Sequence, residues 1–455
     1  MKLKRSAVIA AIGVTAVIMS GCTSSAEQPD DGPLTVWTLE SQPDRVATLE
    51  NLAAEFAESA GTEVEVVAVD EAQYNQLLVS GAAAGELPDV IGGVDLVGVG
   101  ALAANELVDA EAAQQVVDAL GADTFEERSL ERASIDGAVS AVPSDSWTSV
   151  LIYRQDLFDA AGLDAPTTYD DVLAAAEALD GQDGRAGFVG FTDNHEALEH
   201  FALANDCQVV DDDAEVTLDS EQCVDSFALY NELITEYSVD GEQDPNSVRA
   251  TYLAGGAAMA VFSSFILDEL AGLRADLTPS CPECAADPAF LAKNTGVVTT
   301  ITGPDGTEGQ YGKQTNWAIP VDASPAAVDF VEYMMSDGYE AWLAMAPEGK
   351  VPNRLGTADE PREYVDAWRA MASGVETKAP LSDFYPAEVI DAIASSPTQI
   401  SEWGIEQGQA PLMGAILGEQ PIVQAMSDMF AGSLTPEQAA TQAADAIRSI
   451  QDSLR

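Results

Sequence analysis

The sequence predicts an α/β fold with more than one domain, and three observations support this prediction. Segments rich in β-branched and aromatic residues alternate with segments whose apolar residues recur at helical spacing. Glycine or proline marks several boundaries between them, including Gly61, Pro88, Pro143 and Gly162. The chain has 455 residues, of which 47% are hydrophobic, so it is long and apolar enough to bury two or more cores.

The alternation is regular over the residues that follow the N-terminal segment. Strands are expected at residues 34–38, 63–69 and 89–91, and helices at residues 44–60, 74–80 and 96–105. Such alternation predicts a mainly parallel sheet, and ligands of such sheets bind beyond the carboxyl ends of the strands. Candidate ligand contacts therefore lie at residues 38–42, 70–74 and 92–95.

The stretch from Asp136 to Leu163 contains polar and aromatic residues between two apolar runs. We expect strands at residues 138–142 and 149–153, with Pro143 ending the first, followed by a helix at 154–161. Asp145 and Trp147 would then lie in the loop between the strands. A carboxylate and an indole in one loop suggest that the chain passes a binding site there rather than filling a core.

The rest of the chain continues the pattern and becomes mostly helical after the turn-rich segment 347–354. Helices are expected at residues 168–179, 195–204, 223–237, 326–335 and 338–345, and strands at 187–191, 257–262 and 317–320. The last helix is expected to begin at Thr435, where Pro436 and Gln438 complete a capping box.

Acidic residues dominate the charge of the chain. There are 77 Asp and Glu residues against 19 Lys and Arg residues, which gives a formal net charge of −58. Such a chain repels nucleic acids and anionic lipids, so neither is an expected partner. The acidic residues are dispersed rather than gathered in a tail, which favours a solvated surface over an acidic binding tract.

Residues 1–21 have the form of a lipoprotein signal peptide. A basic start precedes an apolar run at residues 7–19, which is too short to favour a stable membrane-spanning helix. The segment Ser20-Gly21-Cys22 resembles a bacterial lipobox, so Cys22 is the expected lipidation site, and residues 22–32 are the expected tether. These features predict an extracytoplasmic protein anchored to the outer face of the cell membrane.

Four cysteines follow Cys22, and their even number in an exported chain predicts disulfides. Local pairing joins Cys207 to Cys223 and Cys281 to Cys284. The second pair also has the spacing of half a zinc site, but the remaining ligands would have to come from distant parts of the sequence. Disulfides are therefore favoured, and no metal is expected.

The motif-like segments of the chain do not have the spacing that catalysis requires. His195 and His200 are five residues apart, about 140° around a helix, so they do not face one metal, and we expect a partly exposed pair near a helix start. The chain lacks a G-x-S-x-G elbow and a P-loop, and residues 98–103 only half-match a dinucleotide fingerprint. Neither an enzymatic activity nor a cofactor is expected. Paired carboxylates are uninformative among 77 acidic residues, so a glycoside hydrolase remains an alternative.

Aromatic residues near the expected strand ends point to a ligand. Sugar rings have apolar faces and hydroxyl edges, so a cleft that binds them combines aromatic platforms with carboxylates and amides. Trp147, Trp317 and Trp403 lie at strand ends or in loops, and for each of them both a site role and a core role remain open. Trp37 lies within a strand and is assigned to the core.

A family resemblance is carried by the stretch GAVSAVPSDSWTSVLIYRQDLFDAAGL, followed by TTYDDVLAAAEAL. It resembles a segment shared by extracellular solute-binding proteins of carbohydrate ABC importers, the maltose-binding-like group. Further pieces follow in the same order, including LPDV from Leu87, YLAGGAAM from Tyr252, WAIPVDASPAAVDFVEYMMS from Trp317 and TPEQAATQAADAI from Thr435. Together with the lipobox, these pieces extend the resemblance over residues 34–450.

The resemblance implies a periplasmic-binding-protein-like fold with two α/β lobes, joined by several crossings, that close on a ligand about a hinge. The N-terminal lobe would take residues 33–142 plus 305–346. The C-terminal lobe would take residues 143–304 plus 347–455.

The ligand contacts that the resemblance implies fall mostly after strands and in loops. They are Glu40, Gln42, Asp95, Asp145, Trp147, Ser264, Phe265, Asn316, Trp317 and Trp403, with Arg354 acting at the second crossing. The chain has Ser263-Ser264-Phe265 where a Gly-x-Trp is common in the family, which leaves the size and identity of the ligand open.

The sequence thus predicts a lipid-anchored, monomeric receptor that binds a sugar or oligosaccharide and passes it to the permease subunits of an ABC importer. An acidic cleft disfavours anionic ligands. A cationic or other non-sugar solute, a surface-anchored glycoside hydrolase and a structural adhesin remain as alternatives.

Overall fold

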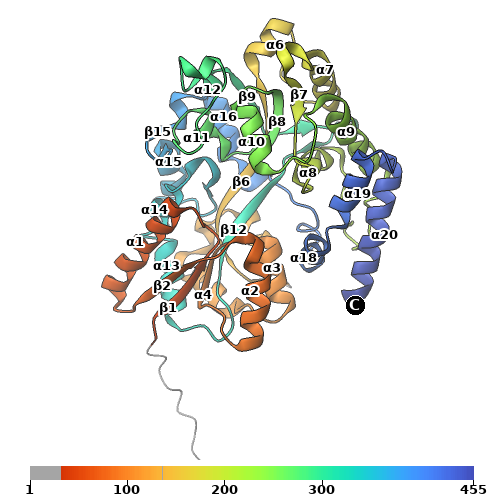
Figure 1. Cartoon of the computed structure of the whole chain (residues 1–455). Helices are drawn as coiled ribbons and strands as arrows, with labels where there is room; N and C mark the ends of the chain where they lie inside the picture. Colours follow the sequence, from red (N-terminus) through yellow and green to blue (C-terminus); the bar gives the residue numbers. More distant parts are fainter. Residues whose placement is uncertain (1–31, 136, 455) are drawn as a thin grey trace, which may run out of the picture. The chain divides into compact units, whose positions relative to one another are not determined.

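A computed structural model describes residues 32–135 and 137–454, and it shows an α/β fold built around a mixed sheet (Figure 1). The expected signal peptide, the lipidation site at Cys22 and the tether up to residue 31 lie outside the described residues, as does Asp136. Within the described part of the chain, no helix combines the length and the apolar character that a bilayer crossing requires.

Nine strands form the main sheet, in the order β2–β1–β3–β12–β6–β8–β7, with β9 and β13 also paired to β6. These strands are β1 (Leu34–Thr38), β2 (Val64–Ala68), β3 (Val90–Asp95), β6 (Val142–Arg154), β7 (Ala186–Val189), β8 (Ala257–Ser263), β9 (Thr295–Val298), β12 (Gly312–Ala318) and β13 (Val351–Pro352). β1 runs parallel to β2 and β3, and β7 runs parallel to β8, whereas β6 and β12 are antiparallel to all their partners. The parallel arrangement expected for the first three strands is confirmed.

Strand β6 corrects one prediction, because it is a single 13-residue strand rather than two strands around a loop. Its first half pairs with β12, and from Ser149 onward it pairs with β8 (Figure 1). Pro143 was expected to end the first strand, but it lies opposite Asn316, where the register with β12 shifts. An irregularity of this kind tolerates the missing N–H of a proline. Asp145 and Trp147 are therefore strand residues, not loop residues.

Helices cover the sheet and form most of the C-terminal third of the chain (Figure 1). The first ten are α1 (Pro43–Ala60), α2 (Glu71–Ala84), α3 (Leu96–Ala104), α4 (Ala110–Leu120), α5 (Glu127–Arg132), α6 (Gln155–Ala161), α7 (Tyr169–Leu179), α8 (Glu196–Ala202), α9 (Glu221–Tyr237) and α10 (Pro245–Leu253). They are followed by α11 (Ile266–Leu270), α12 (Phe290–Asn294), α13 (Ala326–Met334), α14 (Tyr339–Leu343), α15 (Glu363–Ala370), α16 (Ala387–Ala394), α17 (Ser396–Gln399), α18 (Ala410–Glu419), α19 (Pro421–Phe430) and α20 (Pro436–Leu454). Three small hairpins pair β4 (Ser134–Ile135) with β5 (Ala138–Val139), β10 (Ile301–Thr302) with β11 (Glu308–Gly309), and β14 (Ala372–Ser373) with β15 (Ala379–Pro380).

Capping residues predicted from the sequence mark the start of α20 and the end of α1. The Thr435 hydroxyl accepts a hydrogen bond from the Gln438 N–H at 3.2 Å, and the Gln438 side chain accepts one from the Thr435 N–H at 3.0 Å. This is the predicted capping box of α20. Gly61 ends α1 in the left-handed region at φ 76°, which glycine adopts without a steric cost.

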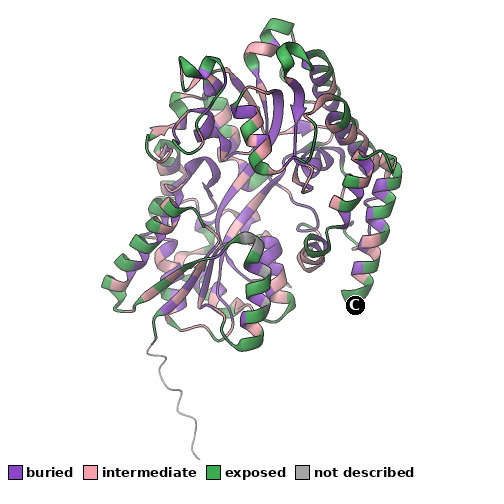
Figure 2. Cartoon of the chain, in the orientation of Figure 1, coloured by how far each residue is buried: buried purple, intermediate pink, exposed green. Residues whose placement is uncertain are grey.

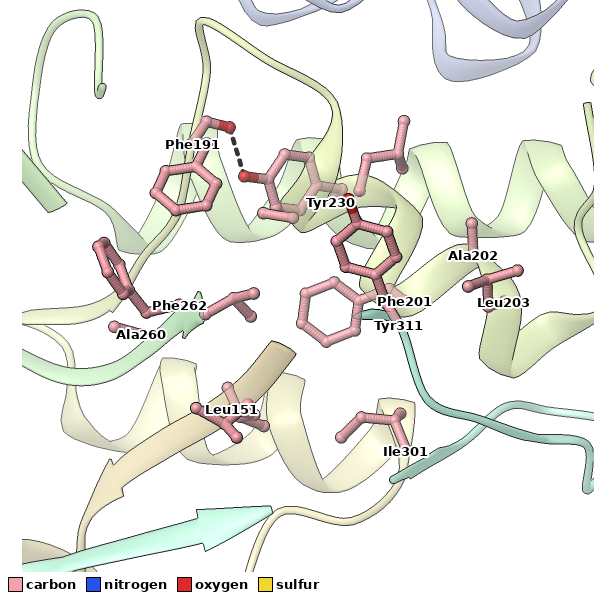
Figure 3. Close-up of a cluster of buried hydrophobic side chains, with 14 of the residues drawn as sticks. Leu151, Phe191, Phe201, Ala202, Leu203, Tyr230, Ala260, Phe262, Ile301 and Tyr311 are labelled. Atoms are coloured by element: carbon pink, nitrogen blue, oxygen red, sulfur yellow. Dashed lines mark hydrogen bonds between the residues drawn. The ribbon is translucent and has the colours of Figure 1, made fainter. Parts of the chain in front are cut away.

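The core consists of three buried hydrophobic clusters, and the buried residues follow the strands in Figure 2. The largest contains the aromatic group of Figure 3, in which Tyr230 donates a hydrogen bond to the carbonyl of Phe191 and packs near Phe201. A second cluster contains Trp317, whose ring lies so close to β3 that a Cβ on Gly92 would be 2.2 Å from it. Only glycine at position 92 allows this approach.

Both predicted disulfides are present in the structure. Cys207 is bonded to Cys223, at the start of α9, and Cys281 is bonded to Cys284. All four side chains are buried within the largest cluster.

Candidate functional site

Two buried charge clusters contain three of the seven polar residues predicted to contact the ligand, namely Glu40, Asp95 and Asp145. We name the first the Lys350 cluster, which consists of Glu40, Arg45, Asp145 and Lys350. We name the second the Lys313 cluster, which consists of Asp95, Glu196, Glu199, Lys313 and Glu402.

The Lys350 cluster balances two carboxylates with two cations. Lys350 Nζ lies 2.5 Å from Glu40 Oε1 and 3.5 Å from Asp145 Oδ2, and Arg45 Nη1 lies 2.7 Å from Glu40 Oε2. The ammonium also lies 4.1 Å from the centre of the Trp342 ring. Burial alone would raise the pKa of Glu40, but Lys350 and Arg45 lower it to about 2. This carboxylate is therefore held ionised.

Hydrogen bonds satisfy the Asp145 carboxylate from several directions. Trp342 Nε1 donates to it at 2.6 Å, and the hydroxyls of Ser144 and Thr315 each donate at 2.7 Å. Asp145 is 1% exposed. It is a structural acceptor at the centre of the β6–β12 pair, because few of its lone pairs remain for another donor.

Two further predicted contacts lie at the edge of the Lys350 cluster. The guanidinium of Arg45 lies 4.9 Å from the centre of the Phe265 ring. The side-chain oxygen of Gln42 accepts a hydrogen bond from Arg274 Nη2 at 3.1 Å. Glu40, Gln42, Asp145 and Phe265 are thus brought to one region although more than 200 residues separate the first from the last.

The Lys313 cluster places one lysine among four carboxylates. Lys313 Nζ lies 3.0 Å from Glu196 Oε1 and 3.8 Å from Asp95 Oδ2. Asp95 also caps α3 by accepting a hydrogen bond from the Gly98 N–H. A cavity of about 80 Å³ lies beside the cluster. It is lined by Val97, Asn194, His195, Glu196, Glu199, Tyr311, Lys313, Glu402, Met413, Ile416, Leu417, Gln420, Ile422 and Val423.

Burial and mutual repulsion set the protonation of this cluster. Burial raises the pKa of Glu402 to about 8, with Lys313 opposing the shift and Asp95 adding to it. Burial together with Glu402 also raises the pKa of Glu199 well above its usual range. In contrast, Lys313 offsets the burial of Glu196 and lowers its pKa. Near neutral pH the cavity therefore contains both an ionised carboxylate, that of Glu196, and a protonated carboxyl group, that of Glu402.

Two of the residues that line the cavity, Tyr311 and His195, each pack against a tryptophan outside the lining. Trp147 meets Tyr311 edge to face with 5.8 Å between ring centres, and Trp403 stacks on His195 at 5.7 Å. Trp147 keeps some exposed surface, whereas Trp403 is fully buried and donates from Nε1 to the Cys207 carbonyl at 2.8 Å. The histidine pair was expected to be partly exposed, and this was wrong. His195 and His200 are buried, and burial lowers the pKa of each to about 4.

Four of the predicted contacts are buried away from the cavity. Trp317 packs against Trp342 in the core, and Asn316 donates to the Val94 carbonyl at 3.1 Å. Arg354 donates to Thr124 Oγ1 at 3.1 Å and to the Leu120 carbonyl at 3.3 Å, and its side chain is buried. Ser264 is fully buried, with its N–H bonded to the Thr148 carbonyl. In this structure these side chains hold strands and turns in place.

A family model described as "Bacterial extracellular solute-binding protein" matches residues 40–341, which is more than half of the chain. The chain belongs to this family. One relative, the "Putative ABC transporter periplasmic-binding protein YcjN" of Escherichia coli (strain K12), is 25% identical over 360 residues, covering 77% of this chain and 79% of the relative. Membership of an extracellular family indicates that this solute-binding protein acts outside the cytoplasm.

Solved structures of binding proteins share its fold at low sequence identity. The GacH receptor of Streptomyces glaucescens GLA.O, described unliganded and with acarbose, has a TM-score of 0.71 at 19% identity, over 92% of this chain and 98% of that chain. The maltose-bound MalE3 of T. maritima has a TM-score of 0.69 at 18% identity, over 92% and 99% of the two chains. The predicted two-lobed periplasmic-binding-protein fold is thereby confirmed.

Sequence reasoning missed several charged residues of this solute-binding protein's clusters. Lys313, Lys350, Glu196, Glu199 and Glu402 were not selected. The three glutamates could not be distinguished by type or spacing from the other acidic residues, since the chain has 77 Asp and Glu residues. The lysines offered a usable signal, because beyond residue 5 lysine occurs only at positions 293, 313, 350 and 378. Among the described residues, no group of three or more His, Cys, Asp or Glu side chains is placed to hold a metal ion.

Proposed function

We propose that this protein binds a sugar or oligosaccharide at the Lys313 cavity and delivers it to an ABC importer. The observation that carries the proposal is the combination of one aromatic ring, that of Tyr311, with the polar groups of Lys313, Glu196 and Glu402 around one cavity. Trp147 packs edge to face against Tyr311. Aromatic rings pack against the C–H surfaces of sugar rings, and carboxyl and ammonium groups form hydrogen bonds with their hydroxyls. Family membership supports the same assignment.

The cavity also suits closure on a ligand between two lobes. Its lining comes from α3 and β12, within the predicted N-terminal lobe (33–142 plus 305–346), and from α8, α18 and α19, within the predicted C-terminal lobe (143–304 plus 347–455). A ligand that contacts both sides favours the closed state by its differential affinity for that state. The permease subunits would then recognise the closed, loaded form.

Of the predicted contacts, Asp95, Trp147 and Trp403 are proposed to act at this site, directly or by holding the groups that line it. Anchoring through Cys22 after removal of residues 1–21, and action as a monomer, complete the proposed arrangement. Mass spectrometry of the protein released from membranes tests the anchor, since an unmodified N-terminal Cys22 would contradict it.

Isothermal titration calorimetry with a panel of mono- and oligosaccharides tests the function. We expect at least one saturable sugar ligand, no products after prolonged incubation, and a smaller scattering radius in the loaded state. Binding of amino acids or peptides but no sugar would overturn the substrate class. Release of shorter sugars would instead support the glycoside hydrolase alternative.

A further inference from the structure

The Lys313 cavity has more acid than base in its lining. Glu196, Glu199 and Glu402 line it, and Lys313 is the only Lys or Arg among its described lining residues. Lys313 is already engaged by Glu196 at 3.0 Å and by Asp95 at 3.8 Å. The remaining carboxyl groups therefore face the cavity without a nearby cation of their own in its wall.

Glu402 is the least satisfied of these groups. Its side chain is 5% exposed, and its Oε2 accepts no hydrogen bond from any described residue. The nearest guanidinium, that of Arg132, lies 3.8 Å away and is also 3.2 Å from Glu406. A buried carboxyl oxygen that accepts no hydrogen bond, and whose nearest guanidinium is shared with a second carboxylate, is costly unless it holds a proton or receives a further cation.

The opposite wall of the cavity offers no charge to Glu402. There, α18 and α19 contribute the aliphatic side chains of Met413, Ile416 and Ile422. His195 does not supply the missing charge either, because burial holds its pKa at about 4 and it is neutral at physiological pH. The described lining residues therefore offer Glu402 no further cation, and a cation carried by the solute would complete the site.

We propose that the natural solute carries a protonated amine, as an amino sugar or an amine-bearing oligosaccharide does, and that Glu199 and Glu402 receive it. The amine would lie against these carboxyl groups, while the carbon framework packs against the aliphatic wall. This inference rests on the proposed function, because it assigns the chemical class of the sugar at the same site.

Calorimetry with matched saccharides tests the inference. Each neutral sugar of the panel, from mono- to tetrasaccharide, is titrated beside the sugar of equal length and linkage that has an amine in place of one hydroxyl on each ring. Glucosamine oligomers, their N-acetylated forms and the corresponding glucose oligomers with the same linkage form one such series. We expect the amine form of the best ligand to bind at least tenfold more tightly than both neutral forms.

The outcomes separate the two claims. Neutral forms that bind as tightly as the amine form would overturn the inference and leave the proposed function intact. If no sugar of any kind binds, the proposed function fails and the inference fails with it.

Variants test whether Glu402 and Glu199 cause the preference for the amine form over the neutral forms. Glu402→Gln should reduce the ratio of neutral to amine dissociation constants at least fivefold, and Glu199→Gln serves as a second variant if the first does not fold. Glu58→Gln, an exposed position on α1, removes the same charge and should leave the ratio unchanged. An unchanged ratio in a folded cavity variant would overturn the role of these carboxyl groups.

Discussion

The two lysine clusters of this protein use similar residues in opposite ways. In the Lys350 cluster, two carboxylates face two cations, and the pKa of Glu40 falls to about 2. In the Lys313 cluster, four carboxyl groups surround one lysine, and the pKa of Glu402 rises to about 8. The first cluster lies within strand and helix packing, and the second borders a cavity.

The difference separates a structural charge cluster from the one that we propose binds the ligand. Buried ions are tolerated when partners and hydrogen bonds compensate their lost hydration, which is the situation of Asp145 and Glu40. Where acids exceed cations beside a cavity, the compensation is incomplete and a ligand can supply it. Charge balance, rather than the presence of charged residues, therefore distinguishes the two regions.

Lys350→Met is expected to have the largest effect on stability. It leaves Glu40 with only Arg45 and removes the one ammonium that contacts Asp145, in a site that is almost fully buried. Removing one partner from a buried ion pair typically costs about 3–5 kcal/mol. The free energy of unfolding, measured by urea denaturation, should fall by that amount.

The matched control for this variant is Lys293→Met. Lys293 pairs with Asp287 at 2.7 Å, but both side chains are well exposed. Exposed pairs contribute about 0–1 kcal/mol, so the control should be nearly as stable as the wild type. Equal losses in the two variants would show that burial of the Lys350 cluster does not matter.

Glu402→Gln is expected to change how stability depends on pH. The folded protein keeps a proton on Glu402 up to a pKa of about 8, whereas the unfolded chain releases it near pH 4.5. The folded state therefore binds more protons in this window, and Glu402 makes stability fall as pH rises from about 4.5 to about 8. The variant should remove a slope of up to about 1.4 kcal/mol per pH unit.

Chemical denaturation of both proteins at intervals between pH 4 and 9 measures this slope. His195 and His200 add an opposite slope between about pH 4 and 6.5, but they do so in both proteins and cancel in the difference. Parallel stability curves for wild type and variant would mean that Glu402 is ionised in the folded state at neutral pH.

Local chemistry explains which features were predictable from the sequence. The caps at Gly61 and Thr435 and the two disulfides involve neighbouring residues, and each was predicted correctly. The continuity of β6 through Pro143 was not predictable, because it depends on the register shift with β12 more than 170 residues later.

The candidate site was only partly predictable for the same reason. Asp95 was found from its place after a strand, but its partner Lys313 is more than 200 residues away. Glu40 and Lys350 are separated by 310 positions, and nothing local marks them as a pair. Trp317 met the sequence criteria for a site residue, but the glycine opposite it at position 92 admits its ring into the core.

Trp147→Ala tests the aromatic side of the Lys313 cavity. The indole is partly exposed and packs edge to face against Tyr311, which lines the cavity, so its loss should leave the Tyr311 ring without this support. We expect at least a tenfold loss of affinity, about 1.4 kcal/mol, by calorimetry with the best ligand of the panel. Trp147→Phe should recover part of the loss. Trp37→Ala, a half-buried tryptophan on β1, should lower stability without this loss of affinity.

Gln42→Ala should have the smallest effect and defines where the Lys350 cluster ends. The Gln42 side chain accepts one hydrogen bond from Arg274 at 3.1 Å, and Arg274 keeps its ion pair with Asp276 when Gln42 is truncated. Because no buried ion loses its partner, stability should fall by at most about 1 kcal/mol. A double-mutant cycle with Arg274→Ala isolates the coupling between the two side chains. A coupling near 3 kcal/mol would show that the Gln42–Arg274 pair belongs to the Lys350 cluster. The difference in charge balance between that cluster and the Lys313 cavity would then be smaller.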